Sequence, residues 1–503
     1  MKGSNLGMDS PISHEVSTNG YREFVNSFSV IGATVYDGTG SEAVVRDVHI
    51  HNGTIVDGPA HSTAQIPAEG LSLCPGFIDV HTHDDLATIH SPLMPFKTLQ
   101  GVTTVVIGNC GTSIAPVSGL MGRHEFDLFA TYFHRLADEP AATNVAALVG
   151  HGSVRAKVMG TTTNRSATSQ ELTEMSHLVE QAMSDGAIGM STGLAYEPGR
   201  YSPTEELVHL SRIVAQHGGI YTTHMRDEGD HLVESVHESI TIGEQANIKI
   251  QISHLKALGA RNFGRVVPAI DAIRAAQERG IDVMADQYPY TRGSTMLEQL
   301  VSDGQVLAVN PTGFHRLESL LVSSSPKHPQ WEGLTLREIA QELQLDDKAA
   351  VEHVISECGR SIIVVIDSLS EQDVCTVMQQ DFVMIGSDGI PTGSNPHPRL
   401  HHTFPRVLGE YARHQGLMSM ATAIHKMTGM SAQRFGLSDR GTIAVGKAAD
   451  LVLFDPATII DTGTYVDPTS VPLGIESVWV NGELVVQQGS VTGARPGIPL
   501  QFR

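Results

Sequence analysis

The sequence has few cysteines, few aromatic residues and no excess of positive charge. Its 503 residues include only four cysteines, Cys74, Cys110, Cys358 and Cys375, and no two of them form a CxxC pair. Scattered cysteines give no disulfide framework and suit a reducing compartment, so we expect a cytoplasmic protein. The formal net charge of −22 argues against nucleic acid and anionic membranes as main partners. No apolar run is long enough to cross a bilayer.

The length and composition predict a large folded domain with smaller attachments. A hydrophobic content of 41% is enough for a full-sized core. The chain is too long for one ordinary core, so more than one unit is expected. Residues 1–27 are polar and lack the apolar segment of a signal peptide, so we expect a mobile N-terminal tail.

The middle of the chain alternates apolar strands with amphipathic helical segments. This alternation predicts a parallel sheet, and at this length the best fit is an α/β fold of the TIM-like (β/α)8 barrel type. There are nine strand candidates, so at least one must lie outside an eight-stranded barrel. The candidates are residues 71–81, 101–109, 144–152, 186–194, 218–224, 248–254, 281–290, 361–367 and 382–389.

Three further segments flank or interrupt the predicted barrel, which is expected to span residues 71–437. Residues 28–70 and 438–503 contain short β-type runs and turns, and we expect them to form one small β-sandwich beside the barrel. Residues 293–360 separate two strand candidates by far more than a usual loop. An insertion of that size at a barrel mouth is usually functional.

The stretch FIDVHTHDD ends a buried strand on two histidines, His81 and His83. Side chains alternate along a strand, so these two imidazoles point to the same side and can converge on one metal ion. Taken alone, the pair could equally be two partly exposed histidines that bind nothing.

Other strands end on residues of the same chemical kind. Cys110 ends one strand in GNCG, His224 and His254 end two others, and Asp388 ends the last in GSDG. Alone, Cys110 could be a small buried hydrophobe, either histidine an ordinary hydrogen-bonded residue, and Asp388 a turn cap. In a (β/α)8 barrel, however, the carboxyl ends of all strands face one mouth. The joint pattern therefore predicts a metal site.

The types of ligand favour zinc over other metals. A thiolate with two imidazoles suits tetrahedral zinc, and a catalytic zinc keeps one position open for water. Zinc lowers the pKa of that water to about 7. Asp388 at the edge of the site can accept the water's proton and pass it to a leaving group.

Several blocks of the sequence resemble those of a known family. The blocks PGFIDVHTHDD, GNCGTSIAP, GAIGMSTGLAYEPG, THMRDEG, ISHLKALG, YPYTRGST, MIGSDG, HPRLHHTFPRVLG and GKAADLVLFDP resemble the amidohydrolase superfamily and, within it, the N-acyl-D-amino-acid deacylases, or D-aminoacylases. The resemblance covers about residues 28–490. HxH indicates only the superfamily, whereas GNCG, STGLAYEPG and the HPR…FPR block are more specific to the deacylase branch.

The resemblance implies a division of roles among the site residues. One tightly bound zinc would be held by Cys110, His224 and His254. A second, weaker or empty site would be formed by His81, His83 and Asp388, and Asp388 would be the catalytic acid and base.

Further positions match the substrate-binding residues of the family. Tyr288 and Arg399 match positions that bind the substrate carboxylate, and Lys256 matches a position near the same end of the pocket. Tyr288 could instead be a structural aromatic, Arg399 a solvated surface residue. Tyr196 either lines the pocket or only packs. Asp84 is expected to support its loop or to hydrogen-bond to a ligand imidazole.

The resemblance implies that the insertion is a lid and that the reaction is zinc-dependent hydrolysis of an N-acyl-D-amino acid to a carboxylate and a free D-amino acid. The expected partner is therefore a small-molecule amide. Two alternatives remain. One is another hydrolase on the same scaffold, acting on a cyclic amide like a dihydropyrimidinase or hydantoinase, or acting as a deaminase. The other is a non-catalytic protein that kept the barrel. A neutral ring substrate would not need Arg399 and Tyr288, and no ligand is missing from the set.

Overall fold

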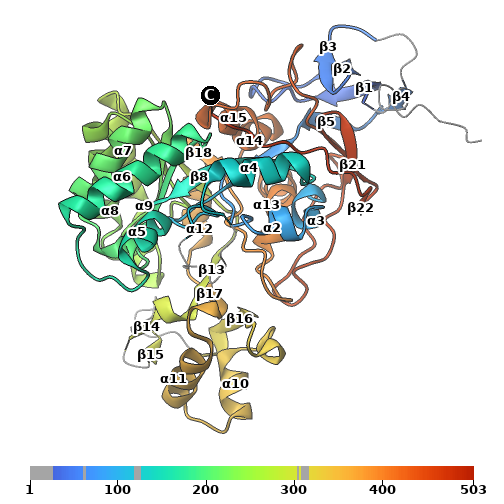
Figure 1. Cartoon of the computed structure of the whole chain (residues 1–503). Helices are drawn as coiled ribbons and strands as arrows, with labels where there is room; N and C mark the ends of the chain where they lie inside the picture. Colours follow the sequence, from blue (N-terminus) through green and yellow to red (C-terminus); the bar gives the residue numbers. More distant parts are fainter. Residues whose placement is uncertain (1–25, 60–63, 118–125, 303–304, 307–316, 503) are drawn as a thin grey trace, which may run out of the picture.

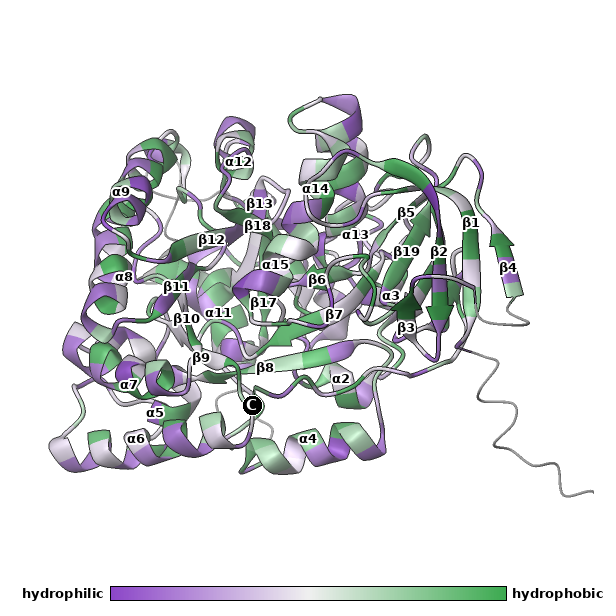
Figure 2. Cartoon of the chain, turned by 90° about the horizontal axis from the view of Figure 1, so that it is seen from above, coloured by the Kyte–Doolittle hydropathy of each residue, from purple (hydrophilic) through white to green (hydrophobic). Residues whose placement is uncertain are grey.

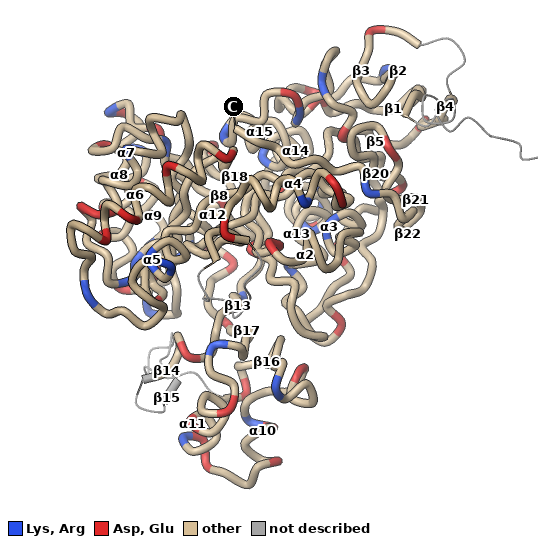
Figure 3. Tube along the Cα trace, viewed as in Figure 1, with Lys and Arg blue, Asp and Glu red and all other residues tan. Residues whose placement is uncertain are grey.

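A computed structural model describes residues 26–59, 64–117, 126–302, 305–306 and 317–502. The N-terminal tail expected over residues 1–27 lies, except for its last two residues, outside the described residues. Within the described part of the chain, no helix is long and apolar enough to cross a membrane. Figure 3 shows Lys and Arg scattered among Asp and Glu along the barrel, the sheet and the insertion.

Eight parallel strands form the predicted barrel, and Figure 2 looks down on them with helices outside. The strands are fully or almost fully buried, as expected when helices cover a parallel sheet. Hydrogen bonding joins them in the order β18-β12-β11-β10-β9-β8-β7-β6. Their bounds are β6 Phe77–Asp79, β7 Val102–Ile107, β8 Asn144–Gly150, β9 Gly189–Gly193, β10 Ile220–His224, β11 Lys249–Ile252, β12 Val283–Gln287 and β18 Val383–Ile385.

The first and last barrel strands, β6 and β18, meet at a seam. The two strands do not pair along their length, and the ring closes just beyond their carboxyl ends through a parallel bridge between Thr82 and Gly389. Asp388 N donates to His81 O at 2.8 Å, and His83 N donates to Gly389 O at 3.2 Å. The seam therefore closes at the residues that the sequence analysis singled out.

Amphipathic helices cover the outside of the barrel. In α6 (Ser169–Ser184) the buried residues Met175, Val179, Ala182 and Met183 lie on one face, and Thr168 starts the helix with a capping box. The other helices between barrel strands are α2 Ala87–His90, α3 Pro95–Thr98, α4 Phe129–Asp138, α5 His151–Met159, α7 Thr204–Gln216, α8 Leu232–Ala246, α9 Val266–Glu278 and α12 Glu371–Met378. After β18 come α13 Arg399–Arg406, the π-helix η7 Val407–His414, α14 Met420–Met427 and α15 Gly429–Arg434.

The two ends of the described chain build one sheet beside the barrel (Figure 1), in the order β22-β21-β20-β19-β5-β1-β2-β3 with β4 added beside β1. The Phe28 ring of β1 stacks on the Trp479 ring of β20 at 5.2 Å, although β19 and β5 lie between these strands in the sheet. The sheet is therefore bent so that its two halves enclose an apolar core. Its strands are β1 Phe28–Val35, β2 Val44–His51, β3 Thr54–Val56, β4 Ala64–Pro67, β5 Ser72–Pro75, β19 Leu451–Phe454, β20 Ile475–Val480, β21 Glu483–Gln487 and β22 Ser490–Val491.

The insertion after β12 projects from the carboxyl end of the barrel (Figure 1). It has its own apolar core, which includes Leu297, Trp331 and Val354. The ninth strand candidate, residues 361–367, belongs here as β17 in the sheet β13-β17-β16. The described elements are β13 Arg292–Met296, β14 Val301–Ser302, β15 Gln305–Val306, β16 Leu320–Ser324, α10 Leu336–Glu342, α11 Asp347–Cys358 and β17 Ile363–Asp367.

Candidate metal centre and active site

All six predicted metal ligands gather at the carboxyl ends of five barrel strands. Cys110 Sγ lies 3.3 Å from His81 Nε2, 3.8 Å from His224 Nδ1 and 3.6 Å from His254 Nε2. Asp388 Oδ1 lies 3.4 Å from His81 Nε2 and 3.1 Å from His83 Nε2. Six side chains that are far apart in the sequence thus meet in one place.

The ligand atoms form two overlapping groups that share Cys110. One group contains His81, His83, Cys110 and Asp388, and the other contains Cys110, His224 and His254. Within each group the ligand atoms lie within 4.8 Å of one another. This spacing suits atoms arranged around a common ion.

Three of these residues have backbone conformations that L-residues rarely adopt. The φ angles of Cys110, His254 and Asp388 are 51°, 36° and 49°. Such conformations cost free energy and concentrate at functional sites, where the surrounding fold enforces them. The glycine after Cys110 is required by packing, because a Cβ on Gly111 would lie 2.6 Å from the backbone N of Gly193.

Two buried carboxylates orient the ligand imidazoles. Asp286 Oδ1 lies 3.0 Å from His81 Nδ1, and Glu228 Oε1 lies 2.8 Å from His254 Nδ1. Each carboxylate favours a proton on Nδ1 and directs Nε2 toward Cys110, as in the carboxylate–histidine pairs of metal sites. Asp286 also accepts a hydrogen bond from His254 N at 2.9 Å. It therefore supports two of the candidate ligands.

Neither carboxylate was predicted from the sequence. Glu228 follows His224 by four residues in THMRDEG, so a carboxylate close to a strand-end histidine was the available signal. Asp286 stands near the end of β12, two residues before Tyr288, and no histidine lies near it in the sequence. Which carboxylate reaches which imidazole depends on contacts between different strands.

The electrostatics favour the ionised forms of the thiol and the carboxylate. Burial alone would raise the pKa of Cys110, but the charge on His81 and hydrogen bonds from His224 and His254 bring that pKa well below its usual value. Burial would likewise raise the pKa of Asp388, and the charges on Arg399 and His81 hold it well below the ordinary range. Thiolate and carboxylate are the forms that bind metals.

Arg399 and Tyr288 lie together beside Asp388. Both are buried, and the guanidinium of Arg399 stacks over the Tyr288 ring at 4.5 Å. Arg399 Nη2 lies 3.0 Å from Asp388 Oδ2 and 3.5 Å from the carbonyl oxygen of Ser294. Among the described residues, Nε and Nη1 of Arg399 have no hydrogen-bond partner. Unpaired donors on a buried guanidinium are costly, and a carboxylate could bind the free edge of Arg399 through Nη1 and the neighbouring Nη2.

Lys256 and Tyr196 contact ligand residues directly. Lys256 Nζ lies 2.7 Å from Glu228 and 2.9 Å from His254 Nδ1, and it lies 5.9 Å from the centre of the Tyr288 ring. The Tyr196 ring lies 4.6 Å from that of His224, and its hydroxyl hydrogen-bonds to Thr295 on β13 of the insertion. Lys256 is thus placed between the ligand support and Tyr288, and Tyr196 joins the barrel mouth to the insertion.

Asp84 supports its loop through a lysine. Its carboxylate lies 3.4 Å from Lys97 Nζ, and both side chains are completely buried. The imidazole partners in this region are Asp286 and Asp388 instead. Burial raises the pKa of Asp84 to about 7, even though Lys97 acts in the opposite direction.

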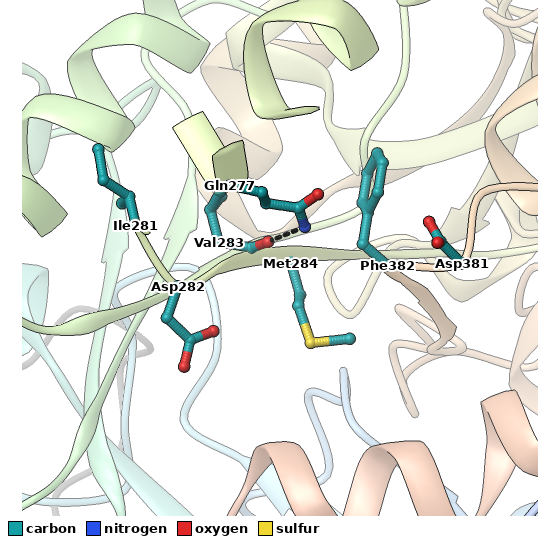
Figure 4. Close-up of a pocket in the computed structure, with 7 residues that line it drawn as sticks. All are labelled: Gln277, Ile281, Asp282, Val283, Met284, Asp381 and Phe382. Atoms are coloured by element: carbon teal, nitrogen blue, oxygen red, sulfur yellow. Dashed lines mark hydrogen bonds between the residues drawn. The ribbon is translucent and has the colours of Figure 1, made fainter. Parts of the chain in front are cut away.

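A hollow at the other end of β12 has different chemistry. Its volume is about 340 Å³, and its lining includes Gln277, Met284 and Phe382 (Figure 4). The acids at its edge, Asp282 and Asp381, pair with Arg434 and Arg274. This hollow holds none of the predicted ligands, because it lies at the amino ends of the strands.

The donor set at the mouth fits zinc. It offers one thiolate, four imidazoles and one carboxylate, and these soft and borderline donors are the ones that zinc prefers. Buried carboxylates already hold two of the imidazoles in the ligating tautomer. The residues are therefore organised as a metal site by the protein itself.

Comparisons with known proteins agree with this geometry. The model of the amidohydrolase family matches residues 65–285 and 372–486, so the insertion lies outside the matched residues. The chain is 41% identical to a D-aminoacylase of Alcaligenes xylosoxydans xylosoxydans, over 93% of this chain and 96% of that protein. It is also 41% identical to an N-acyl-D-aspartate deacylase of the same organism, over 93% and 94%.

A solved structure shares the whole architecture. It is the N-acyl-D-glutamate deacylase of Bordetella bronchiseptica, complexed with zinc and a phosphonate inhibitor that mimics the tetrahedral intermediate. The identity is 34%, the TM-score is 0.86, and the match covers 94% of this chain and 99% of that one. The chain therefore belongs to the amidohydrolase family, in the branch of the N-acyl-D-amino-acid deacylases, and is a hydrolase of amide bonds.

Proposed function

We propose that this chain hydrolyses the amide bond of N-acyl-D-amino acids and releases a carboxylate and a free D-amino acid. The observation that carries the proposal is the position of Asp388. Its Oδ1 faces the histidines His81 and His83, and its Oδ2 lies 3.0 Å from Arg399. One acid/base group thus stands between a metal-ligand cluster and a cation suited to a substrate carboxylate. An acyl amino acid carries an amide and a carboxylate close together, so its amide could face the ligand cluster while its carboxylate faces Arg399.

Zinc is the metal that we propose for the cluster. Cys110, His224 and His254 would hold one ion tightly, because they combine the thiolate with two imidazoles. His81, His83 and Asp388 would form a second, weaker site. When bound, zinc supplies a Lewis acid for the amide carbonyl and for a water molecule. Cys110 must then be reduced and outside any disulfide, a state that a reducing compartment such as the cytoplasm would preserve.

Asp388 is the proposed general base and acid. Its pKa is held low, so it is ionised and ready to accept a proton from water. The same carboxyl group then donates that proton to the leaving amine, which departs as a free amino group. General acid–base groups placed in this way contribute about 10²- to 10⁴-fold to rate.

Arg399 and Tyr288 are the proposed clamp for the substrate carboxylate. The unpaired Nη1 of Arg399, together with an N–H of the neighbouring Nη2, would offer a fork of two donors, and the Tyr288 hydroxyl would add a third. Gly293 borders the clamp, where a Cβ would lie 3.1 Å from Ser368 Oγ and 3.5 Å from the Tyr288 hydroxyl. We place Lys256 at the same end of the pocket and Tyr196 on its wall, under the insertion as a lid.

The clamp also separates this proposal from the alternative on the same scaffold. A hydantoin or dihydropyrimidine ring carries no carboxylate before it is opened. Binding such a ring would leave the buried donors of Arg399 without a partner, at a cost of about 1–3 kcal/mol for each unsatisfied group. The clamp therefore favours a linear acyl amino acid over a cyclic amide.

A substrate panel tests the proposal. N-acetyl-D- and N-acetyl-L-amino acids with apolar, acidic and basic side chains are assayed for released amino acid, with a hydantoin and a dihydropyrimidine as ring controls. We expect release of D-amino acids and no opening of the rings. Ring opening without cleavage of any N-acetyl amino acid would favour the alternative reaction.

A further inference from the structure

A buried lysine lies directly behind the candidate site and has no part in the reaction proposed above. Lys97 belongs to the short helix α3, and its side chain is completely buried. Its Nζ donates to Asp79 Oδ2 at 2.7 Å and to Ser387 Oγ at 2.9 Å, and it lies 3.4 Å from Asp84 Oδ2. These three partners come from both sides of the seam between β6 and β18.

The partners of Lys97 are joined to the seam by further hydrogen bonds. Asp79 Oδ1 accepts from Ser387 N at 2.8 Å and from His81 N at 3.3 Å. Ser387 Oγ accepts from Gly389 N at 3.0 Å. The network therefore connects the last residue of β6 to the backbone on both sides of Asp388.

The seam carries half of the candidate ligand set. His81 and His83 follow β6, and Asp388 follows β18, so the spacing between the two groups depends on how these two chain segments are held together. The strands themselves do not pair, and the backbone bonds of the seam begin only beyond their ends. A side-chain network behind the seam is thus in a position to set the distance from Asp388 to the two histidines.

The charge on Lys97 is maintained inside the protein. Burial alone would lower the pKa of Lys97, but the carboxylates of Asp79 and Asp84 raise it above the usual value. A buried ammonium is costly to desolvate, and it fixes the geometry of the groups that neutralise it. Such a network costs more than an apolar contact would, which suggests a role beyond stability.

We propose that Lys97 is a positioning residue, which holds the His81–His83 loop and Asp388 in register across the seam through Asp79 and Ser387. The inference deepens the proposed function, because the residues that it positions are those assigned to the second metal group and to acid/base catalysis. The metal titration below uses no substrate. A wrong substrate assignment would therefore leave its result unchanged.

The test begins with Lys97→Met in the full-length chain. Zinc binding to the metal-free protein is measured by competition with a chromophoric chelator. His81, His83 and Asp388 are called the seam group, and the zinc-binding step that belongs to them is the one that is lost in His83→Ala. We expect Lys97→Met to weaken that step about 10- to 100-fold, as loss of groups that support ligands typically does. The step assigned to Cys110, His224 and His254 should not change.

Lys426→Met is the matched control. Lys426 is also a buried lysine, but it lies at the amino end of β18, where it donates to the carbonyls of Gln380 and Val383. We expect this variant to lose stability while both zinc steps and kcat remain as in the parent. In Lys97→Met we expect kcat to fall about 10- to 100-fold, with KM within about twofold, because Asp388 is displaced and the clamp is not.

A second variant separates positioning from stability. Asp79→Asn and Asp84→Asn combined with Lys97→Met remove all three buried charges, so no carboxylate is left without its lysine. If Lys97 positions the site, the triple variant should regain stability relative to Lys97→Met and still bind zinc weakly at the group formed by His81, His83 and Asp388. Parent-like zinc affinity and kcat in the triple variant would overturn the proposal.

Ser387→Ala provides a third measurement if the charge variants do not fold. It keeps the Lys97–Asp79 ion pair and removes the hydrogen bonds that Ser387 Oγ accepts from Lys97 and from Gly389 N and donates to the carbonyl of His81. We expect a smaller loss of zinc affinity in the same binding step. Unchanged affinity at that step in Ser387→Ala would contradict the assigned register, because Ser387 is the partner of Lys97 on the β18 side.

Discussion

Replacing Arg399 by methionine tests the carboxylate clamp. Methionine keeps much of the buried apolar volume and removes the guanidinium, whose Nε and Nη1 are the unpaired donors that face no protein partner among the described residues. Each hydrogen bond between charged groups contributes about 1.5–3 kcal/mol. Two such bonds to a substrate carboxylate therefore amount to roughly 3–6 kcal/mol, or about 10²- to 10⁴-fold in kcat/KM.

The assay pairs the variant with a change in the substrate. Parent and Arg399→Met are each measured with an N-acetyl-D-amino acid and with the corresponding C-terminal carboxamide, which lacks the carboxylate. If the guanidinium binds the carboxylate, the kcat/KM of the parent should fall on going from the acid to the carboxamide. This fall should be about as large as the fall in kcat/KM for the acid on going from the parent to Arg399→Met. The two losses should not add, since either change removes the same interaction.

Additivity of the two losses and a surface control variant decide whether Arg399 binds the carboxylate. Additive losses would mean that Arg399 and the substrate carboxylate do not interact, and the clamp would be wrong. Arg337→Met serves as the control, because Arg337 lies on the insertion and pairs with Asp347 at the surface. It should change kcat/KM by less than about twofold, as surface ion pairs contribute little.

Three further predictions concern the acid/base group, the ligand support and the fold. Asp388→Asn should still bind zinc at the Cys110 group but lower kcat by about 10²- to 10⁴-fold, and unchanged turnover in steady-state assays would remove the acid/base assignment. Glu228→Gln should weaken zinc binding about 10- to 100-fold in chelator competition, because the carboxylate no longer fixes the His254 tautomer; parent-like affinity would count against that support. Arg155→Met should lower the free energy of unfolding by about 3–5 kcal/mol in urea at neutral pH, since the buried Glu206 loses its guanidinium partner and keeps only His151 beside it. Burial would raise the pKa of Glu206, but His151 and Arg155 lower it overall, so its contribution is present above the unfolded value of 4.5 and is lost as pH falls through the folded value. The difference in free energy of unfolding between parent and Arg155→Met should therefore narrow as pH falls through the folded pKa of Glu206. A difference that stays constant with pH would contradict this role of Glu206.

The sequence was sufficient for the barrel and for the residues at its mouth. The alternation of apolar strands with amphipathic helical segments predicted nine strands that include the eight of the barrel, and residues at strand ends must meet at one mouth in this fold. His224 ends β10 itself, and the other ligands follow their strands by two to four residues. These positions were readable because they depend on local order along the chain.

Contacts between distant segments were not readable in the same way. Lys97 reaches Ser387 across 290 positions of sequence, and Asp286 reaches His81 across 205. Nothing in the local pattern of α3 distinguishes Lys97 from a solvated lysine. The strand pattern of residues 361–367 likewise resembled a barrel strand, because pairing with β13 and β16 is decided by the insertion as a whole.

The central claim is most directly tested by following zinc and product on one sample. Zinc content per chain is measured as a chelator removes the metal and added zinc restores it, while the release of free D- and L-amino acid from the N-acetyl substrates is assayed at each step. We expect the rate of D-amino acid release to rise as the first, tightly held zinc is restored, and we expect no cleavage of the L-substrate. Full zinc occupancy with neither enantiomer cleaved would contradict the assigned substrate class.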